Sequence, residues 1–339
     1  MPHRTVLCGG AGFLGHHLAL ALQQTTDFQP FIVDALSVNN LTQWAGKTGL
    51  RSDRSWQFLL DRMTLLRQAG IPLLTCDARD YTRLSRVLAE IRPQVIIHLA
   101  AVAHAGTSNK TPFDTFDHSL RTLENALDYA RGKNSGVQHF IYQSSSMVYG
   151  HMPKPATEED VLDPVGVYGN LKLAAERMVL AYWQTSGVPC TITRPSALYG
   201  PRCVSRRVIQ VFIETALVGW PLEIAGDGEE ILDFTSVDDW VQGMLLVLRK
   251  RQARNQVFNL TYGQGRSLNE LAACVQSHFP AIEVRHVARD NLMPFRNTLS
   301  IAKAQRLLGY APQVPLEEGV KKYVDWYRDK ERRCPGIIA

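Results

Sequence analysis

The chain has 339 residues, of which 45% are hydrophobic, so it can bury a large core as one two-part α/β unit or as two domains. Its 37 basic and 32 acidic side chains give a net charge of +5 that is spread along the chain, which argues against a nucleic-acid-binding protein. No apolar run reaches the ~18 residues of a membrane span, and no signal segment precedes the first expected strand.

The six cysteines include no C-x-x-C pair, and a chain of this size needs no disulfide staples. We therefore expect reduced thiols in a cytoplasmic protein. His98 and His104 have no cluster of carboxylates or cysteines beside them in the sequence. We expect structural histidines rather than metal ligands, and no metal site.

The first predicted element is a short strand at 5–8 that runs into a glycine-rich turn and then a helix to about residue 24. Gly9, Gly12 and Gly15 are spaced G-x-x-G-x-x-G between the strand and the helix. Such a turn brings the backbone close to a pyrophosphate at the helix N-terminus. The pattern predicts a dinucleotide site; the alternative is a structural glycine turn.

The next strand, at 31–33, ends in Asp34, about 20 residues after the glycines. A carboxylate at this place can hold both hydroxyls of an adenine ribose and repels a 2′-phosphate. Asp34 therefore favours NAD over NADP, unless it is only a turn residue.

Residues 39–70 resemble an insertion with an amphipathic helix at 56–68, for which the sequence suggests no chemistry. A strand at 71–74 follows, and Asp77 comes just after it. Asp77 is expected either to accept a hydrogen bond from the adenine amino group or to cap a helix at 81–91.

The apolar run at 95–99 has the character of a buried parallel strand, and small residues follow it, which would let a cofactor pass close to the backbone. A helix at 113–131 and a strand at 140–143 come next. Ser144, Ser145 and Ser146 stand where that strand ends, and ligands bind at strand ends in such sheets. The serines are expected to donate to a substrate oxygen or to serve as turn and cap residues.

Tyr168 and Lys172 are four residues apart and so lie on one side of a helix, one turn apart. A free phenol titrates near pH ~10, and a neighbouring ammonium favours the phenolate. The pair predicts a general base, although a surface pair without function has the same spacing.

Taken in order, these stretches resemble the extended short-chain dehydrogenase/reductase family, especially its nucleotide-sugar epimerases and dehydratases. Further matches are the segments 98–101, 194–201, 226–228, 233–234 and 237–239, so the resemblance covers nearly the whole chain. It implies that Tyr168 is the base, that Lys172 holds the nicotinamide ribose and that Ser145 is the catalytic serine. It also implies contacts to NAD from Gly9, Gly12, Phe13, Leu14, Gly15, Asp34, Asp77, Ala78, Leu99, Ala100, Ala101, Ser144, Tyr168, Lys172 and Pro195.

The two residues directly after Ser145 differ between the subfamilies of that family. Dehydratases carry an Asp-Glu pair there and UDP-glucuronate decarboxylases a glutamate at the second place, whereas this chain has Ser146 and Met147. Methionine cannot transfer protons, so the stretch is most similar to that of 4-epimerases acting on UDP-sugars. The expected substrate contacts are Ser145, Ser146, Tyr168, Ser196, Arg202, Arg206 and Arg207.

The chain departs from the family pattern at three places. Ser119 and Ser196 stand where an asparagine is usual, and Leu232 stands where an arginine usually binds the pyrophosphate. Leucine cannot replace that charge-assisted anchor. Either another cation binds the diphosphate or the substrate is not a standard UDP-hexose; the candidate cations are Arg202, Arg206, Arg207, Arg289 and Arg296.

We predict an α/β fold with a Rossmann-type doubly wound parallel sheet: an NAD-binding domain at 1–190, to which later strands return, and a smaller substrate lobe at 191–339. Strands are expected at 190–194, 257–260 and 284–287, and a loop over the site at 151–165.

The predicted function is NAD-dependent epimerisation of a nucleotide sugar at C4, of the UDP-hexose or UDP-hexuronate type. The alternatives are a net oxidoreductase or another nucleotide-sugar-modifying enzyme of the same family and, from another class, a non-catalytic NAD-binding regulator. Apolar residues on more than one face of the helices near 113–131 and 168–186 favour a homodimer.

Overall fold

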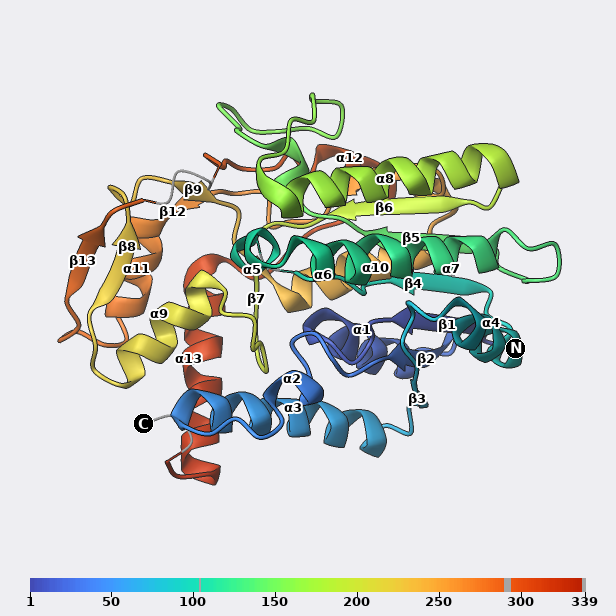
Figure 1. Ribbon diagram of the computed structural model, residues 1–339. Helices are drawn as coiled ribbons and strands as arrows, with labels where there is room; N and C mark the ends of the chain where they lie inside the picture. Colours follow the sequence, from blue (N-terminus) through green and yellow to red (C-terminus); the bar gives the residue numbers. More distant parts are fainter. Residues whose placement is uncertain (104, 290–293, 337–339) are drawn as a thin grey trace.

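A seven-stranded, fully parallel sheet forms the centre of the protein in a computed structural model that describes residues 1–103, 105–289 and 294–336 (Figure 1). The strand order is β11-β6-β5-β4-β1-β2-β3, as the predicted Rossmann-type fold requires. The strands are β1 (His3–Cys8), β2 (Phe28–Asp34), β3 (Leu73–Thr75), β4 (Val95–His98), β5 (His139–Gln143), β6 (Cys190–Arg194) and β11 (Gln256–Asn259).

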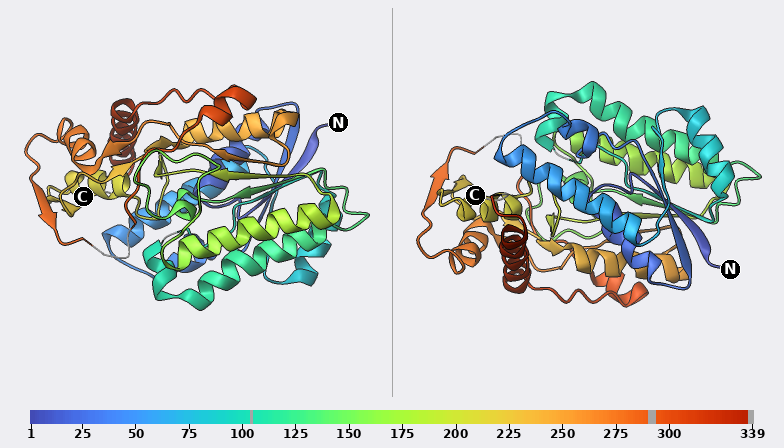
Figure 2. Two further views of the ribbon diagram at one scale, coloured as in Figure 1. Left: turned by 90° about the horizontal axis from the view of Figure 1, so that it is seen from above. Right: turned by 90° about the horizontal axis from the view of Figure 1, so that it is seen from below.

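Helices cover both faces of this sheet, which is why every residue of the central strands β4, β5 and β6 is buried (Figure 2). Leu7 of β1 packs into the core on one face, whereas its neighbours Val6 and Cys8 pack into the core on the other, as the period of two in a strand dictates. The first face carries α1 (Phe13–Gln23), α3 (Leu50–Gln68), α10 (Val237–Arg249) and α12 (Ala302–Leu308); the second carries α4 (Tyr81–Ile91), α7 (Thr122–Ala130) and α8 (Gly166–Ser186).

A second core lies beyond the carboxyl ends of the strands and is formed mainly by the C-terminal half of the chain. Short strands pair there as β8 with β13, β9 with β12, and β7 with β10. Strand β11 nevertheless returns to the central sheet beside β6, so the halves of the sequence interleave. The elements of this part are β7 (Leu198–Tyr199), α9 (Val208–Leu217), β8 (Leu222–Ala225), β9 (Ile231–Leu232), β10 (Thr235–Ser236), α11 (Leu268–Gln276), β12 (Arg266–Ser267), β13 (Val284–Val287) and α13 (Leu316–Arg333).

The segment 39–70 connects the two cores. It forms α2 (Leu41–Trp44) and α3, and α3 begins six residues before the predicted start. Periodicity missed this start because the first turns of α3 are mostly polar and are anchored by a tertiary contact, a 2.6 Å ion pair between Arg54 and Glu214 of α9. Phe58 in the middle of α3 packs against α13, with its ring centroid 4.8 Å from that of Trp326.

The helix predicted at 113–131 is divided. It consists of α6 (Pro112–Phe116), a π-helical segment at Asp117–Arg121 and α7, and it is preceded by α5 (Ala105–Lys110). A π turn holds one more residue than an α turn, so it rotates the helix after it relative to the helix before it. His118 within this segment and Thr122 directly after it line a cleft beside the glycine turn and the end of β4.

The loop predicted at 151–165 does lack helices and regular strands, but its place is different from that expected. Its backbone pairs with the 295–300 segment, through Met152 N–H to the carbonyl of Phe295 (2.8 Å) and Ala156 N–H to that of Thr298 (3.0 Å). None of its residues lines the cleft at the ends of β1, β2 and β4 or the neighbouring cleft between β5, β6 and α9. Among the described residues, no helix is long and apolar enough to cross a membrane.

Candidate functional site

The glycine-rich turn between β1 and α1 has the close packing that its sequence predicted. Gly9 has φ +78°, and a Cβ atom there would lie 2.6 Å from the backbone nitrogen of Ala100 at the end of β4. A Cβ atom at Gly15 would lie 2.4 Å from the Cα atom of Gly10. Helix α1 begins after Gly12 without a side-chain cap, so the N–H groups of its first turn remain available to a pyrophosphate.

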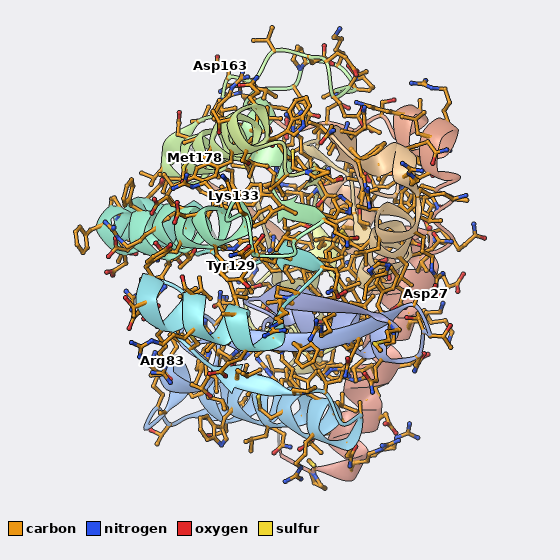
Figure 3. All side chains as sticks on the ribbon, turned by 90° about the vertical axis from the view of Figure 1, so that its right-hand side faces the viewer. Asp27, Arg83, Tyr129, Lys133, Asp163 and Met178 are labelled. Carbon is orange, nitrogen blue, oxygen red and sulfur yellow. The ribbon has the colours of Figure 1, made fainter. Side chains whose placement is uncertain are left out.

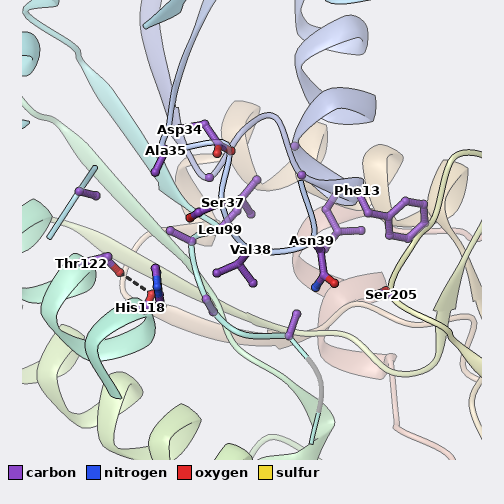
Figure 4. A pocket seen from close by; sticks show the side chains of 18 of the residues that line it. Phe13, Asp34, Ala35, Ser37, Val38, Asn39, Leu99, His118, Thr122 and Ser205 are labelled. Atoms are coloured by element: carbon purple, nitrogen blue, oxygen red, sulfur yellow. Dashed lines mark hydrogen bonds between the residues drawn. The ribbon is translucent and has the colours of Figure 1, made fainter. Parts of the chain in front are cut away.

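A cleft runs from this turn across the carboxyl ends of β2 and β4 (Figure 4). Asp34 lies at one end of the cleft and accepts hydrogen bonds from the backbone N–H groups of Ala11 (2.9 Å) and Leu36 (2.7 Å). Burial raises the pKa of this carboxyl, and those two bonds oppose the rise. The glycine turn and Asp34 both line this cleft, as a dinucleotide site requires. Of the predicted cofactor contacts, Gly9, Gly12, Phe13, Leu14, Gly15, Asp34, Asp77, Ala78, Leu99, Ala100 and Ala101 line it.

Asp77 lines the cleft but does not cap α4, so that alternative was wrong. The cap is Asp80, whose carboxylate accepts from the N–H of Arg83 at 3.0 Å. Asp77 instead forms a half-exposed ion pair of 2.6 Å with Arg79, which lowers the pKa of the Asp77 carboxyl.

Other residues of this cleft were missed by the sequence analysis. Arg62 of α3 is fully buried and donates to the backbone carbonyls of Arg202 and Asn39 while lining the cleft. His118 and Thr122 also line it, and the Thr122 hydroxyl donates to the carbonyl of His118 at 2.9 Å. No local pattern identifies these residues, because only tertiary packing and the π turn bring them here.

A second cleft adjoins the first, sharing Leu14, Leu99, Ala101, Ala103 and Arg207 with it. It lies between the ends of β5 and β6 and helix α9. Of the predicted site residues, it is lined by Ser144, Ser145, Ser146, Tyr168, Lys172, Pro195, Ser196, Arg206 and Arg207.

Tyr168 stands in the first turn of α8 with its phenol directed to this second cleft. Burial raises the pKa of the phenol. Two groups oppose the rise: the guanidinium of Arg207 first, and then a hydrogen bond from the Ser145 hydroxyl. Arg207 and Ser145 are thus the groups that oppose the effect of burial on this pKa, and an effect of Lys172 on the phenol stays a prediction.

Lys172 is buried and lies one turn further along α8. Its Nζ donates to the backbone carbonyl of Gln143 at 2.6 Å and lies 4.8 Å from the ring centre of Tyr142. Burial lowers the pKa of the Lys172 ammonium to about 7, and the Glu176 carboxylate acts in the opposite direction.

The three serines after β5 have different partners. The Ser144 hydroxyl donates to Glu176 Oε1 at 2.5 Å, so its proton is not directed at a substrate. Ser145 Oγ accepts from the N–H of Met147 at 3.2 Å and is the serine that meets Tyr168. Ser146 lines the second cleft and begins a short 3₁₀ helix.

The arginines that line the second cleft are Arg206, Arg207 and Arg296. Arg296 donates to Glu230 Oε1 at 3.0 Å. Arg202 lines neither cleft: its Nε donates to His16 Nε2 at 2.9 Å, so the geometry gives its predicted role in substrate binding no support.

The departures from the family pattern also have definite places. Leu232 lines the second cleft, so the missing arginine leaves an apolar wall there. Ser196 also lines it, and the buried Oγ of Ser196 has no hydrogen-bond partner within the described residues. Ser119 lies buried in the π turn and lines neither cleft.

His98 is structural, as predicted. It is fully buried, its Nε2 lies 3.4 Å from the Thr122 hydroxyl, and burial, with a contribution from Lys172, lowers the pKa of its imidazole to about 3. His104 lies outside the described residues. All six cysteines are free.

Comparison with known proteins agrees with this geometry. Residues 5–261 match the model of the NAD dependent epimerase/dehydratase family. The chain is 29% identical to a probable UDP-glucuronate 4-epimerase of Rhizobium meliloti over 98% of each chain. It is 26% identical to a dTDP-glucose 4,6-dehydratase of Haemophilus influenzae over 95% of this chain and 97% of that protein. The crystal structure of UDP-glucose 4-epimerase from Thermotoga maritima with UDP-glucose superimposes with a TM-score of 0.83 at 27% identity, covering 96% of this chain and 99% of that one.

The matched region contains the whole of the glycine turn, Asp34 and the segment from Tyr168 to Lys172. The cofactor of the matched family is NAD. The cleft at the ends of β1, β2 and β4 is lined by the glycine turn and by Asp34, the groups that such a cofactor requires. The chain belongs to the NAD dependent epimerase/dehydratase family.

Proposed function

We propose that the protein is an NAD-dependent epimerase that inverts C4 of a nucleotide-activated sugar through a transient 4-keto form. The observation that carries this proposal is that the two clefts share a wall, and that Tyr168 and Ser145 line the second of them. A sugar in the second cleft would present one carbon both to the phenol and to the nicotinamide.

Each of the protein's own groups has one part in this reaction. The glycine turn, Asp34 and Lys172 would hold NAD, which would supply reversible hydride transfer at C4 when bound. Tyr168 takes the proton of the C4 hydroxyl and gives it back, and Ser145 holds the same oxygen by a hydrogen bond. Arg207 favours the charged form of the phenol, and Lys172 holds the nicotinamide ribose through its ammonium.

Dehydration is the weaker candidate, although relatives of the chain include a dehydratase. Loss of water needs a further acid and base beside the sugar, and the two residues after Ser145 are Ser146 and Met147. Net oxidation or reduction remains the alternative within the family. It would produce a steady change in the nicotinamide absorbance, which an epimerase does not.

Recognition of the diphosphate would differ from the usual pattern. Leu232 cannot form an ion pair, so we assign the diphosphate to Arg296 and Arg206, which line the same cleft. The unpartnered hydroxyl of Ser196 would supply a hydrogen bond where an asparagine is usual. The apolar wall formed by Leu232 would face the sugar or the nucleoside.

We also propose a homodimer in the cytoplasm. Helices α7 and α8 lie side by side on one side of the molecule, with Tyr129 on α7 and Met178 on α8 (Figure 3). Phe113 and Phe116 of the preceding α6 are 79% and 46% exposed, and an apolar face of this kind favours burial against a second copy. Light scattering at micromolar concentration tests this: a monomeric mass would contradict it.

The function is tested by incubating the NAD-loaded protein with UDP-glucose, UDP-galactose, UDP-glucuronate and dTDP-glucose in turn. Proton NMR of the sugar ring identifies a C4 epimer, and the nicotinamide absorbance is recorded in the same sample. We expect one sugar to reach an epimer mixture without a net absorbance change. A 4-keto-6-deoxy product would assign the protein to the dehydratases, and accumulation of NADH would assign it to the oxidoreductases.

A further inference from the structure

Glu176 is a buried carboxylate beside the proposed catalytic centre, and it has no part in the proposed chemistry. It lies on α8 four residues after Lys172 and eight after Tyr168, so the three side chains share one face of the helix. Its side chain is 3% exposed, and so is that of its partner Arg194 on β6. A charge buried to this extent is retained only where it is paired and hydrogen-bonded.

The carboxylate is fully occupied by two elements of the sheet. Arg194 donates to it through Nε (2.9 Å) and Nη2 (2.6 Å), a two-point contact that fixes the orientation of the carboxylate. The Ser144 hydroxyl donates to the same Oε1 atom as Arg194 Nε. Arg194 is itself held by Tyr149, whose hydroxyl oxygen lies 2.9 Å from Nη1.

Two successive turns of α8 thereby hold two successive residues at the end of β5. Lys172 donates to the carbonyl of Gln143, and Glu176 accepts from the side chain of Ser144. The next residue is Ser145, which meets the Tyr168 phenol. The position of the reacting groups therefore depends on Glu176 without any contact between Glu176 and the second cleft.

Glu176 also balances a charge. Lys172 lies beside the imidazole of His98 on β4 and the ring of Tyr142 on β5, and neither of these is an anion at neutral pH. Glu176 is the carboxylate among the described residues that acts on Lys172, and it opposes the effect of burial, which brings the pKa of Lys172 to about 7. Loss of this carboxylate would lower the pKa of Lys172 further, so its buried ammonium would lose its proton more readily.

We propose that Glu176 is a positioning residue that keeps Lys172 cationic and fixes the end of β5, so that NAD meets an ammonium and Tyr168 meets Ser145. The proposal rests on the function proposed above for the cofactor contact of Lys172. It is an effect through Lys172 and Ser144, since Glu176 lines neither cleft.

The direct test is the titration of Lys172, followed by NMR of the protein labelled with ¹³C at lysine Cε, with Lys172→Met identifying the resonance. We expect the wild-type midpoint near pH 7 and a midpoint about one pH unit lower in Glu176→Gln, the low end for removal of a nearby opposite charge. Because the sugar plays no part, this result is independent of the reaction that the enzyme catalyses.

Glu214→Gln is the matched control. Glu214 is a buried glutamate on a helix, paired with an arginine at 2.6 Å, but it lies on α9 and is not among the groups that act on the pKa of Lys172. We expect it to leave the midpoint of Lys172 unchanged. Ser144→Ala keeps every charge and should also leave the midpoint unchanged. A midpoint in Glu176→Gln equal to that of the wild type, or an equal shift in Glu214→Gln, would overturn the proposal.

Two further measurements keep the test decisive. If Glu176→Gln does not fold, Glu176→Asp retains the charge and should keep the wild-type midpoint within a few tenths of a pH unit; a drop as large as that expected for glutamine would refute the electrostatic role. Calorimetry of NAD binding against pH separates the two proposals. A wild-type affinity that stays constant through the titration of Lys172 would remove the cofactor role of Lys172 while leaving the effect of Glu176 on its charge intact.

Discussion

Replacement of Tyr168 by phenylalanine tests the proposed chemistry with the smallest structural change. The variant loses one oxygen and the hydrogen bond to Ser145, which is worth about 1 kcal/mol net, and it keeps the ring. For a chain of this size, such a loss shifts the melting temperature by roughly 2–4 °C or less. A general base contributes about 10²–10⁴-fold to the rate, so turnover of the sugar should fall by that factor.

The assay is NMR-detected conversion of the sugar identified by the substrate panel, with NAD affinity measured by calorimetry on the same sample. Affinity for NAD should remain within about threefold of the wild type, because the glycine turn, Asp34 and Lys172 are intact. Tyr310→Phe makes the same chemical change at a buried phenol that has no hydrogen-bond partner within the described residues and lines neither cleft, and it should leave turnover unchanged. Turnover within a few fold of the wild type in Tyr168→Phe would refute the assignment of Tyr168 as the base.

Three further predictions concern the cofactor, the substrate and acid stability. Asp34→Asn removes the carboxylate that faces a 2′-phosphate, so calorimetry should show the preference for NAD over NADP reduced by about tenfold or more, and an unchanged preference would contradict the role of Asp34. Arg296→Met should weaken UDP binding by about tenfold or more and raise KM more than it lowers kcat, whereas UDP affinity equal to that of the wild type would move the diphosphate elsewhere. Burial lowers the pKa of His139 to about 4 and that of His98 to about 3. Between these values and about pH 6.5 the unfolded state therefore binds more protons than the folded state. The free energy of unfolding should decrease as the pH is lowered through this window, by up to about 1.4 kcal/mol per pH unit for each histidine. Urea unfolding at several pH values should therefore show a shallower decline in His139→Gln, and an unchanged decline would exclude His139 as a contributor.

The features that were predictable from the sequence are those specified by local physics. The strands of the central sheet were predicted to within a few residues, mostly from apolar runs bounded by turns, because both faces of a buried parallel strand are covered. The glycine turn was predictable because a side chain at Gly9 would clash with Ala100, and one at Gly15 would clash with Gly10. The π turn at Asp117–Arg121 and the early start of α3 were not, because both depend on contacts with distant residues.

The same distinction explains the errors in the predicted site. Spacing of four residues on a helix places Tyr168 and Lys172 on one face, but it does not say which atoms their side chains reach. In the folded chain the Lys172 stem turns to the carbonyl of Gln143, and the charge that acts on the phenol comes from Arg207 at the start of α9, 35 residues further along the chain than Lys172. Glu176 lay on the same face in the sequence and was overlooked, because its partner Arg194 comes from a different strand. A helical face predicted from spacing thus identifies the candidates for a site, whereas the partners that decide their charges are determined by the tertiary fold.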